Sequence, residues 1–395
     1  MIVVEMLPAQ EGDCFLIAVD NKYHILVDGG TPYTYRHYLK SRLIKLAEDK
    51  KVIDLLIVTH VDNDHIGGII SFIKENGNAS NPQIIPVKEV WHNSYRHLQF
   101  DKNGKLEFRE KEILKSIVAK GAMEEHIKNN DESVKDISGY QGTTLAGLLY
   151  SNGYNWNTIS NNLPIKKGVF QEIDKNIHIK VIAPQDNELE ELGKVWKKQL
   201  MQKKHSFLFS DELLFDDAYE YYMRFLREPF IEAREISYMK EEENIEKLAY
   251  KEYPSDISVV NNSSICFEID YKGTLLLFLG DKSVGSLDMN LIKEKYALLK
   301  VPHHGSNNNY SIEFAKKVHA DVYLLSTNGR KYQHPDKEMI AKIIYFNKEK
   351  KKIFFNYNNL SIFNFLNGIE LSRYNVEIQR PDRYETLVIN IEGGE

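Results

Sequence analysis

Four side chains that can bind a metal ion lie within six consecutive residues in the first part of the chain. They are His60, Asp62, Asp64 and His65, and Gly67-Gly68 follows them. Imidazole and carboxylate groups are ligands for Zn²⁺, Mn²⁺ or Fe, and two such pairs could hold two ions. A lone histidine or aspartate is better explained as a polar residue of a loop that caps a helix. Four such residues before two glycines favour a metal site.

The segment before these residues is expected to position them. Residues 54–59 are rich in Leu, Ile and Val, which predicts a short buried strand. Because the backbone turns at the carboxyl end of a strand, His60 and Asp62 can point into one cleft. Asp64 and His65 can reach the same cleft from the turn, and an apolar helix is expected to begin there.

Further potential ligands follow other predicted strands. They are Asp28, Asp281, His303, His304 and His334. Each alone has an ordinary explanation as a polar residue of a turn or loop. A two-metal site needs a carboxylate that bridges the ions and imidazoles that complete their coordination. The sequence therefore predicts that these separate strand ends converge on one metal site.

Length, charge and cysteine content limit the class of protein. The 395 residues are enough for one large α/β domain, or for a domain with a sizeable insertion. A formal net charge of -6 provides no overall basic surface, so a nucleic acid would have to be bound locally. Cys14 and Cys266 both lie in apolar, strand-like runs, which indicates buried thiols in a reducing compartment.

The N-terminal residues contain no basic stretch followed by a long apolar run. Nor does any segment approach the roughly 18 uninterrupted apolar residues of a membrane-spanning helix. We therefore expect a soluble, cytoplasmic protein without a membrane partner.

In its motifs the chain resembles the metallo-β-lactamase superfamily of metallohydrolases. The resemblance is carried by His60-x-Asp62-x-Asp64-His65-x-Gly67-Gly68, with Asp28-Gly29-Gly30 upstream and Gly280-Asp281 downstream. More narrowly, the chain is similar to the metallohydrolase domain of the competence DNA-uptake protein ComEC. The segments that carry this similarity are Gly12-Asp13, Asn262-Ser263-Ser264, VPHHGS at 301–306 and Tyr332-x-His334-Pro335.

The resemblance covers about residues 1–91 and 262–357. It implies an α/β fold, an αβ/βα four-layer sandwich of two mixed sheets with helical insertions and the metals at one edge. Residues 1–95 would form the first half of this domain, and residues 261–395 the second half. Residues 96–260 would be a mainly helical insertion with a sheet strand near 176–184. The tail is expected to add closing strands at 352–357, 360–365 and 385–391.

The resemblance also implies roles for the candidate residues. His60 and Asp62 match ligands of a first metal, Asp64 and His65 ligands of a second, and Asp281 the bridging carboxylate. His304 matches the late histidine of the second site, although the sequence leaves open whether His303 or His304 is the ligand. Asp28 would support the ligands from behind. Asp64 would act in catalysis together with His303 and His334, which are left for phosphate contact or for proton transfer to the leaving oxygen.

The chain departs from the superfamily pattern in two places. Asp62 stands where most members have histidine, which favours Mn²⁺ or Mg²⁺ over Zn²⁺ at the first site. No histidine between the first motif and Asp281 is an evident third ligand, because His178 lies within a predicted strand and His92 ends another. The first metal is therefore expected to be weakly held or absent.

These features predict a hydrolase that uses two divalent ions, Zn²⁺ or Mn²⁺ with Mg²⁺ as a further possibility. The leading hypothesis is a phosphodiesterase or nuclease that acts on nucleic acid or another phosphoester, in a setting such as bacterial defence. A second is hydrolysis of a small phosphoester, lactone or thioester, which the acidic net charge favours somewhat. A third is a non-catalytic protein on the same fold, whose insertions contact a second copy or another protein.

Overall fold

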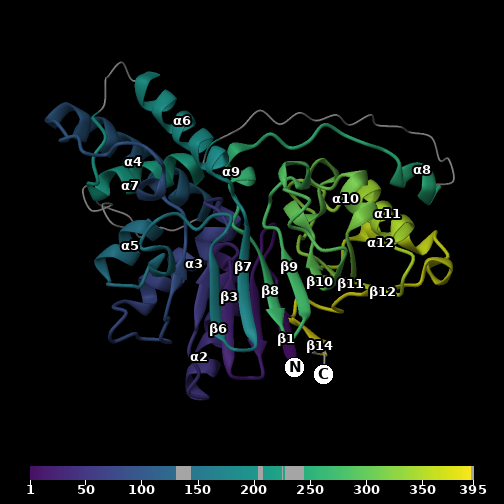
Figure 1. The fold of residues 1–395 in the computed structure, drawn as a ribbon. Coiled ribbons are helices and arrows are strands. Elements are labelled where there is room, and N and C mark those ends of the chain that lie inside the picture. The colour runs from purple at the N-terminus through teal and green to yellow at the C-terminus, as the bar shows by residue number, and fades with distance from the viewer. Residues whose placement is uncertain (130–143, 203–207, 225, 227–243, 393–395) are drawn as a thin grey trace.

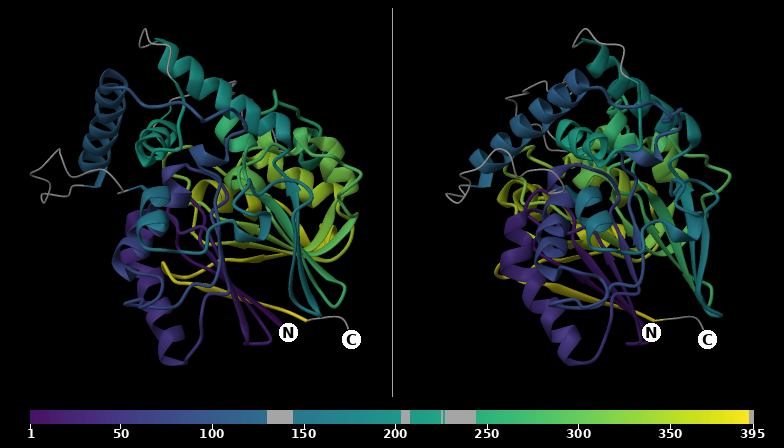
Figure 2. Two further views of the ribbon diagram at one scale, coloured as in Figure 1. Left: turned by 60° about the vertical axis from the view of Figure 1, so that its left-hand side comes forward. Right: turned by 90° about the vertical axis from the view of Figure 1, so that its left-hand side faces the viewer.

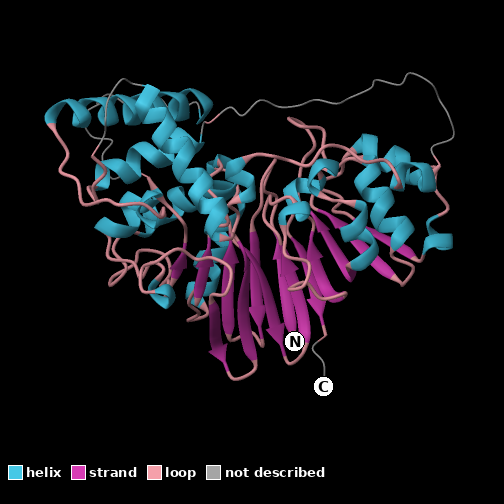
Figure 3. Ribbon diagram, turned by 45° about the horizontal axis from the view of Figure 1, so that its top comes forward, coloured by secondary structure: helices cyan, strands magenta, loops and turns pink. Residues whose placement is uncertain are grey.

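The computed structural model describes residues 1–129, 144–202, 208–224, 226 and 244–392. Two β-sheets pack face to face at the centre, and helices cover their outer faces (Figures 1 and 3). The first sheet has the strand order β14-β1-β2-β3-β4-β5. Its strands are β1 (Ile2–Met6), β2 (Phe15–Val19), β3 (Tyr23–Val27), β4 (Leu55–Ile57), β5 (Val90–Trp91) and β14 (Leu387–Ile391).

The second sheet has the strand order β13-β12-β11-β10-β9-β8-β7-β6. Its strands are β6 (Phe170–Asp174), β7 (Ile177–Ala183), β8 (Cys266–Tyr271), β9 (Thr274–Phe278), β10 (Lys295–Lys300), β11 (His319–Leu325), β12 (Lys351–Phe355) and β13 (Val376–Gln379). Both sheets are mixed. Strands β3, β4 and β5 of the first sheet run parallel, as do β9 to β13 of the second, so their carboxyl ends meet at one edge.

Alternating side chains explain why the strands form a sandwich. In β4, Leu55 and Ile57 lie in the core between the two sheets, whereas Leu56 lies in the core under the helices. In β2, Phe15 and Ile17 likewise face the second sheet. Successive side chains of a strand point to opposite faces, so a strand that is apolar on both faces needs cover on both sides.

Helices provide that cover. The first sheet is covered by α1 (Pro32–Thr34), a π-helical turn (Tyr35–Leu39), α2 (Lys40–Glu48) and α3 (Asn63–Asn76). The second sheet is covered by α8 (Ile245–Ala249), α10 (Ile312–Lys317), α11 (Lys337–Phe346) and α12 (Leu360–Asn367). The two views of Figure 2 show the two halves of the chain stacked in this way. The predicted αβ/βα four-layer sandwich is confirmed.

The part of the sequence between the two halves of the sandwich adds further helices, which lie at the upper left of Figure 1. They are α4 (Phe108–Asn129), α5 (Leu145–Ser151), α6 (Asp186–Gln202) and α7 (Leu213–Arg224), and α9 (Val259–Asn262) adjoins α6. Around Trp196, Phe215 and Tyr219, helices α4, α6 and α7 have an apolar core of their own, whereas α5 packs in the core under the helices of the first sheet. Residues 227–243 of the predicted helical insertion lie outside the described residues. Among those described, no helix is long and apolar enough to cross a bilayer.

One closing strand predicted from the sequence is wrong. Residues 360–365 lie in α12 rather than in a strand. The side chains of Ile362, Phe363 and Leu366 are buried on one face of this helix, at the spacing of a helical turn. Asn359 caps the helix, because its side-chain oxygen accepts hydrogen bonds from the backbone N–H groups of Ser361 and Ile362.

Candidate metal centre

The candidate residues gather at the edge where the parallel strands end. Asp28 follows β3, His60 comes shortly after β4, and Asp281 comes shortly after β9. His304 lies in a short 3-10 turn (Pro302–Gly305) after β10. A backbone hydrogen bond of 2.8 Å from Ile265 N to the Thr59 carbonyl ties the two sheets together here. Segments more than 200 residues apart in the sequence therefore share one site.

Glycines allow the close backbone approach that the site needs. A Cβ atom on Gly12 would lie 1.7 Å from the carbonyl oxygen of Asp64, and one on Gly68 would lie 1.9 Å from that of Gly29. The N–H of Gly29 donates to the carbonyl of His65 at 2.9 Å. Only glycine fits these contacts without displacing the loop that carries the candidate ligands. The Gly-Gly pairs thus fix α3, whose first turn carries Asp64 and His65, against the end of β3, which Asp28 follows.

Three side-chain atoms have the separations that one metal ion would give them. His65 Nε2 lies 3.4 Å from His304 Nε2 and 3.3 Å from Asp281 Oδ2, and His304 Nε2 lies 3.2 Å from Asp281 Oδ2. Asp64 Oδ2 lies 3.6 Å from His304 Nε2. Ligands about 2.0–2.2 Å from a tetrahedral ion are roughly 3.3–3.6 Å apart. His65, Asp281 and His304 therefore fit one divalent ion, and Asp64 lies beside His304.

Hydrogen bonds behind the histidines set the tautomer that a metal ion requires. Asp28 Oδ2 accepts from His65 Nδ1 at 2.9 Å and from the Thr59 hydroxyl at 2.7 Å. Since this hydroxyl donates to Asp28, it accepts from His60 Nδ1, which lies 3.0 Å away. Both imidazoles thus carry their proton on Nδ1 and present the Nε2 lone pair to the site.

His304 is held in the same way from the other sheet. Its Nδ1 lies 2.9 Å from the carbonyl oxygen of Ser326, which follows β11 and can only accept. The Ser326 hydroxyl donates to the carbonyl of Gly12 at 2.6 Å, which joins this support to the turn before β2. The lone pair of His304 Nε2 therefore faces Asp281, as metal coordination requires.

The residues predicted for a first metal lie nearby but farther apart. His60 Nε2 is 3.7 Å from Asp62 Oδ2 and 3.9 Å from Asp281 Oδ2. His60 Nε2 is buried and has no hydrogen-bond partner among the described residues, which fits an atom that faces an ion. His92 instead bonds to Glu220 at 2.9 Å, and His178 lies on β7 beside Glu172. Neither of these two histidines completes the first site.

His303 and His334 lie side by side next to the cluster, with their ring centres 5.7 Å apart. His303 Nε2 is 3.9 Å from Asp281 Oδ2, and its Nδ1 is 2.9 Å from Asn309 Oδ1. Because the Asn309 side-chain nitrogen donates to Asp256 and to the Asp281 carbonyl, its Oδ1 must accept from His303. His334 is buried farther out, and its Nδ1 is 3.3 Å from Asp336 Oδ1.

Two buried residues of the site were given no role from the sequence. Asp13 and Lys300 form an ion pair, and each has less than 3 % of its side chain exposed. Asp13 has an oxygen within the same 4.8 Å cluster as His65, Asp281 and His304. Asp13 Oδ1 lies 3.5 Å from His304 Nδ1, and Asp13 Oδ2 lies 3.9 Å from His65 Nδ1. Asp13 therefore supports these histidines from behind, and Lys300 neutralises it.

Without an ion, the buried carboxylates and histidines act strongly on each other. Burial opposes ionisation of Asp281, but His304 and His65 outweigh it and hold its pKa well below the usual range. Burial likewise opposes protonation of His304, but Asp281 and Asp13 raise its pKa to about 9. The pKa of His65 is also raised, against burial, by Asp281 and Asp28. A divalent cation would replace these protons, since it binds the same lone pairs.

An arginine of the helical insertion contacts the loop that carries the candidate ligands. Arg224, at the end of α7, donates from Nη2 to Asn63 Oδ1 at 2.7 Å. Asn63 is the residue between Asp62 and Asp64, and Arg224 is buried with 5 % of its surface exposed. The sequence offered no signal for this contact, because the partner lies 161 residues away.

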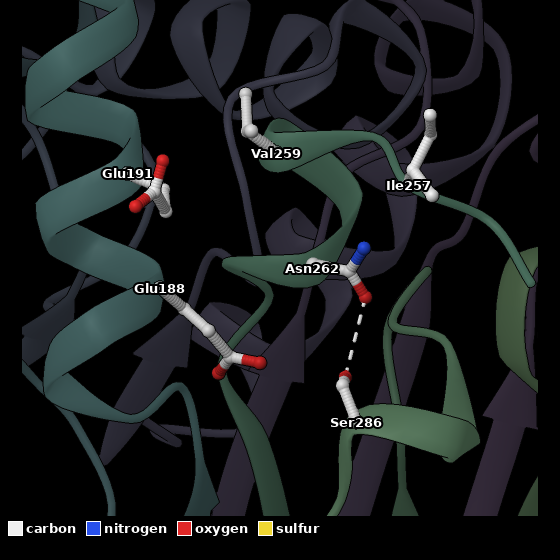
Figure 4. Close-up of a pocket in the computed structure, with 6 residues that line it drawn as sticks. All are labelled: Glu188, Glu191, Ile257, Val259, Asn262 and Ser286. Carbon is white, nitrogen blue, oxygen red and sulfur yellow. Dashed lines mark hydrogen bonds between the residues drawn. The ribbon is translucent and has the colours of Figure 1, made fainter.

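A surface pocket between α6 and α9 is separate from the metal cluster. It is lined by Glu188, Glu191, Ile257, Val259, Asn262 and Ser286 (Figure 4). Lys282, the residue after Asp281, reaches into this region and pairs with Glu188 and with the carbonyl of Asn262. Its two carboxylates are already paired, Glu188 with Lys282 and Glu191 with Lys194, and no histidine lines it, so we assign it no chemistry.

The match to a family model supports the fold. Residues 7–112 match the family model described as the metallo-beta-lactamase superfamily. The solved structures that match include a long form RNase Z from yeast, at 10% sequence identity and a TM-score of 0.32. The alignment covers 100% of this chain and 50% of that one, so the chain spans about half its length. A likeness this low carries no argument about function. No curated protein matches the chain.

Proposed function

We propose that this chain, which carries a metallo-beta-lactamase superfamily domain, is a metal-dependent phosphodiesterase that acts on nucleic acid. The observation that carries the proposal is the spacing of His65 Nε2, His304 Nε2 and Asp281 Oδ2, which lie 3.2 to 3.4 Å from one another. Their lone pairs face one point, and carboxylates complete the set. Such donor sets bind Zn²⁺ or Mn²⁺.

A divalent ion at this point would lower the pKa of a water molecule and polarise a phosphoryl oxygen. The chain's own residues would keep the ion and substrate in place. Asp28 and the Ser326 carbonyl fix the orientation of His65 and His304. Asp62 and Asp64, with 34% and 26% of their side chains exposed, form the open side through which a substrate would enter.

His303 is the residue that we propose as proton donor to the leaving oxygen. Its Nδ1 is fixed by Asn309, and its Nε2 faces the side of Asp281 that the histidine ligands also face. Nε2 can therefore carry a proton toward a bound ester without a change of rotamer. His334 stands behind His303 and would contact a phosphate oxygen that extends beyond it. His304 rather than His303 is assigned as the ligand, because it lies closer to Asp281.

A substrate panel tests the proposal. The purified protein, supplied with Mn²⁺ or Zn²⁺, is assayed on bis-p-nitrophenyl phosphate, p-nitrophenyl phosphate, a lactone, a thioester and single-stranded DNA. We expect turnover of the phosphodiesters and its loss with a chelator. Because Asp281 Oδ2 lies 3.2 to 3.9 Å from a ring nitrogen of His60, His65, His303 and His304, Asp281→Ala should lower turnover by roughly 1,000-fold or more.

The control is Asp270→Ala, which changes an aspartate near the end of β8 whose side chain accepts a hydrogen bond from the Gly273 N–H, and it should retain turnover. Metal-dependent turnover of the lactone or thioester alone would replace the proposal by the corresponding esterase activity. If no substrate were turned over with either metal, a non-catalytic role would be favoured instead.

A further inference from the structure

A group of tyrosines lies beside the candidate metal centre. Tyr33 and Tyr38 come from the segment after Asp28-Gly29-Gly30, Tyr357 follows β12, and Tyr384 precedes β14. The ring centres of Tyr357 and Tyr384 are 5.4 Å apart, and those of Tyr33 and Tyr38 are 6.4 Å apart. Burial, followed by the nearby hydroxyls of Tyr33 and Tyr384, raises the pKa of Tyr38. The four residues form one group, called here the tyrosine patch.

Two members of the tyrosine patch present their rings to solvent. Tyr33 is 41% exposed and Tyr384 is 58% exposed, whereas Tyr357 is buried beneath them. The hydroxyl of Tyr357 accepts a hydrogen bond from the backbone of Gln10 at 2.8 Å, which fixes the floor of the patch. The Tyr33 ring packs against His37 with their centres 3.9 Å apart, and the Tyr384 ring packs against Tyr357. Each exposed ring is thus held by a neighbouring ring, and a planar group that stacks on its free face costs little entropy.

Two exposed cations adjoin the tyrosine patch. Arg330 Nη2 lies 3.4 Å from the Tyr384 hydroxyl, and Lys331 Nζ lies 4.4 Å from the centre of the Tyr332 ring. Both cations belong to the loop that leads to His334, and the rings of Tyr332 and His334 stack 6.2 Å apart. Aromatic faces and positive charge thus continue from the patch toward the metal centre.

A single turn separates the tyrosine patch from the metal centre. Gln10, at one end of the turn, contacts Tyr357 and accepts a hydrogen bond from the backbone of Asn328 at 2.8 Å. Gly12, farther along the turn, packs against Asp64, whose partly exposed carboxylate lies on the open side of the candidate metal centre. A ligand that covers this turn would therefore touch both places at once.

We propose that the tyrosine patch, with Arg330 and Lys331, binds a single-stranded polynucleotide and leads one of its phosphodiesters to the metal centre. This inference rests on the proposed function. Stacked aromatic rings beside cations suit unpaired bases and the phosphates between them. Within a duplex the faces of the bases are already stacked on each other, so only a single strand could use the exposed rings. A small phosphoester would not need a stacking surface outside the centre.

Binding is measured by fluorescence anisotropy with short labelled oligothymidylate and oligouridylate, in Mn²⁺. Asp64→Asn is the background, so that binding is read without cleavage. We expect the double variant Tyr33→Ala/Tyr384→Ala to bind roughly 10-fold or more weakly, whereas Tyr33→Phe/Tyr384→Phe, which keeps the rings, should bind normally. Arg330→Gln/Lys331→Gln should weaken binding and reduce its dependence on salt. The two oligonucleotides distinguish DNA from RNA.

Tyr250→Ala is the matched control, because Tyr250 is 51% exposed and carries a lysine over its ring but lies against α11. It should leave binding unchanged. Equal binding by the double alanine variant and its parent would overturn the inference. It would also be overturned if the parent were a dimer and the double alanine variant a monomer, because the patch would then be an interface between two copies of the chain. Turnover of bis-p-nitrophenyl phosphate by the wild-type protein is measured separately. Turnover without oligonucleotide binding would end this inference alone, and failure of turnover would end the proposed function.

Discussion

The ammonium group of Lys300 and the carboxylate of Asp13 form a buried ion pair directly behind His65 and His304. Lys300 also donates a hydrogen bond of 3.0 Å to the Gly280 carbonyl, next to Asp281. The pair thus connects the start of β2, the end of β9 and the end of β10 beneath the candidate ligands. A buried charge of this kind is stable only while its partner is present.

Lys300→Met is therefore expected to lower the free energy of unfolding by about 3–5 kcal/mol in metal-free protein, because it leaves Asp13 charged and buried. Urea denaturation measures this change. Adding Asp13→Asn should recover part of the loss, since the unpaired charge is then removed. A single variant as stable as the wild type would show that the pair has no such role.

Arg224 tests whether the helical insertion supports the loop that carries the candidate ligands. Arg224→Met removes the donor to Asn63, and we expect affinity for Mn²⁺ to fall by roughly 10-fold, the equivalent of one hydrogen bond to a charged group. Calorimetric titration with Mn²⁺ measures it. Arg373→Met, at a position with 73% of the side chain exposed, is the control. Equal affinity of the Arg224 variant and the wild type would assign Arg224 to the stability of the insertion alone.

The buried Lys342 is expected to make the free energy of unfolding depend on pH. It is buried on α11, where it donates to Asn307 Oδ1 and to the Tyr310 carbonyl, and burial lowers its pKa to about 8. A lysine in the unfolded chain has a pKa of about 10.4. Between these two values the unfolded chain binds more protons than the folded one, so this residue's contribution makes stability rise with pH in that window.

Below about pH 8 both states are protonated, and the cost of burying the charge is fully present. The difference in unfolding free energy between wild type and Lys342→Met should therefore change in favour of the wild type as the pH is raised from about 7 to about 9.5. Urea titrations across this range measure it. A difference that does not vary with pH would mean that Lys342 keeps an ordinary pKa.

The fold and part of the candidate site could be predicted from the sequence. The short apolar run before His60 and the two glycines after His65 give a local pattern that predicts a strand, a turn and a helix. Asp281 and His304 follow their own strands, and parallel strands bring such ends to one edge. The structure places both beside His65, and their roles as ligands stay a prediction.

The rest depended on contacts between distant parts of the chain. Lys300 sits in an apolar run, and a lone lysine there signals a buried carboxylate partner, but the sequence does not say which one. The contact of Arg224 with Asn63 and the assembly of the tyrosine patch follow from tertiary packing alone. Residues 360–365 were misread because a short apolar run does not distinguish a strand from a helix. The narrower similarity to ComEC stays a prediction.

The central claim is that His65, His304 and Asp281 bind one divalent ion. Anomalous diffraction from crystals soaked in Mn²⁺ tests it most directly. We expect a peak about 2.0–2.4 Å from His65 Nε2, His304 Nε2 and an oxygen of Asp281, and a second, weaker peak beside His60 and Asp62. Crystals of protein that turns over phosphodiesters in Mn²⁺, yet show no peak between His65 and His304, would contradict the account.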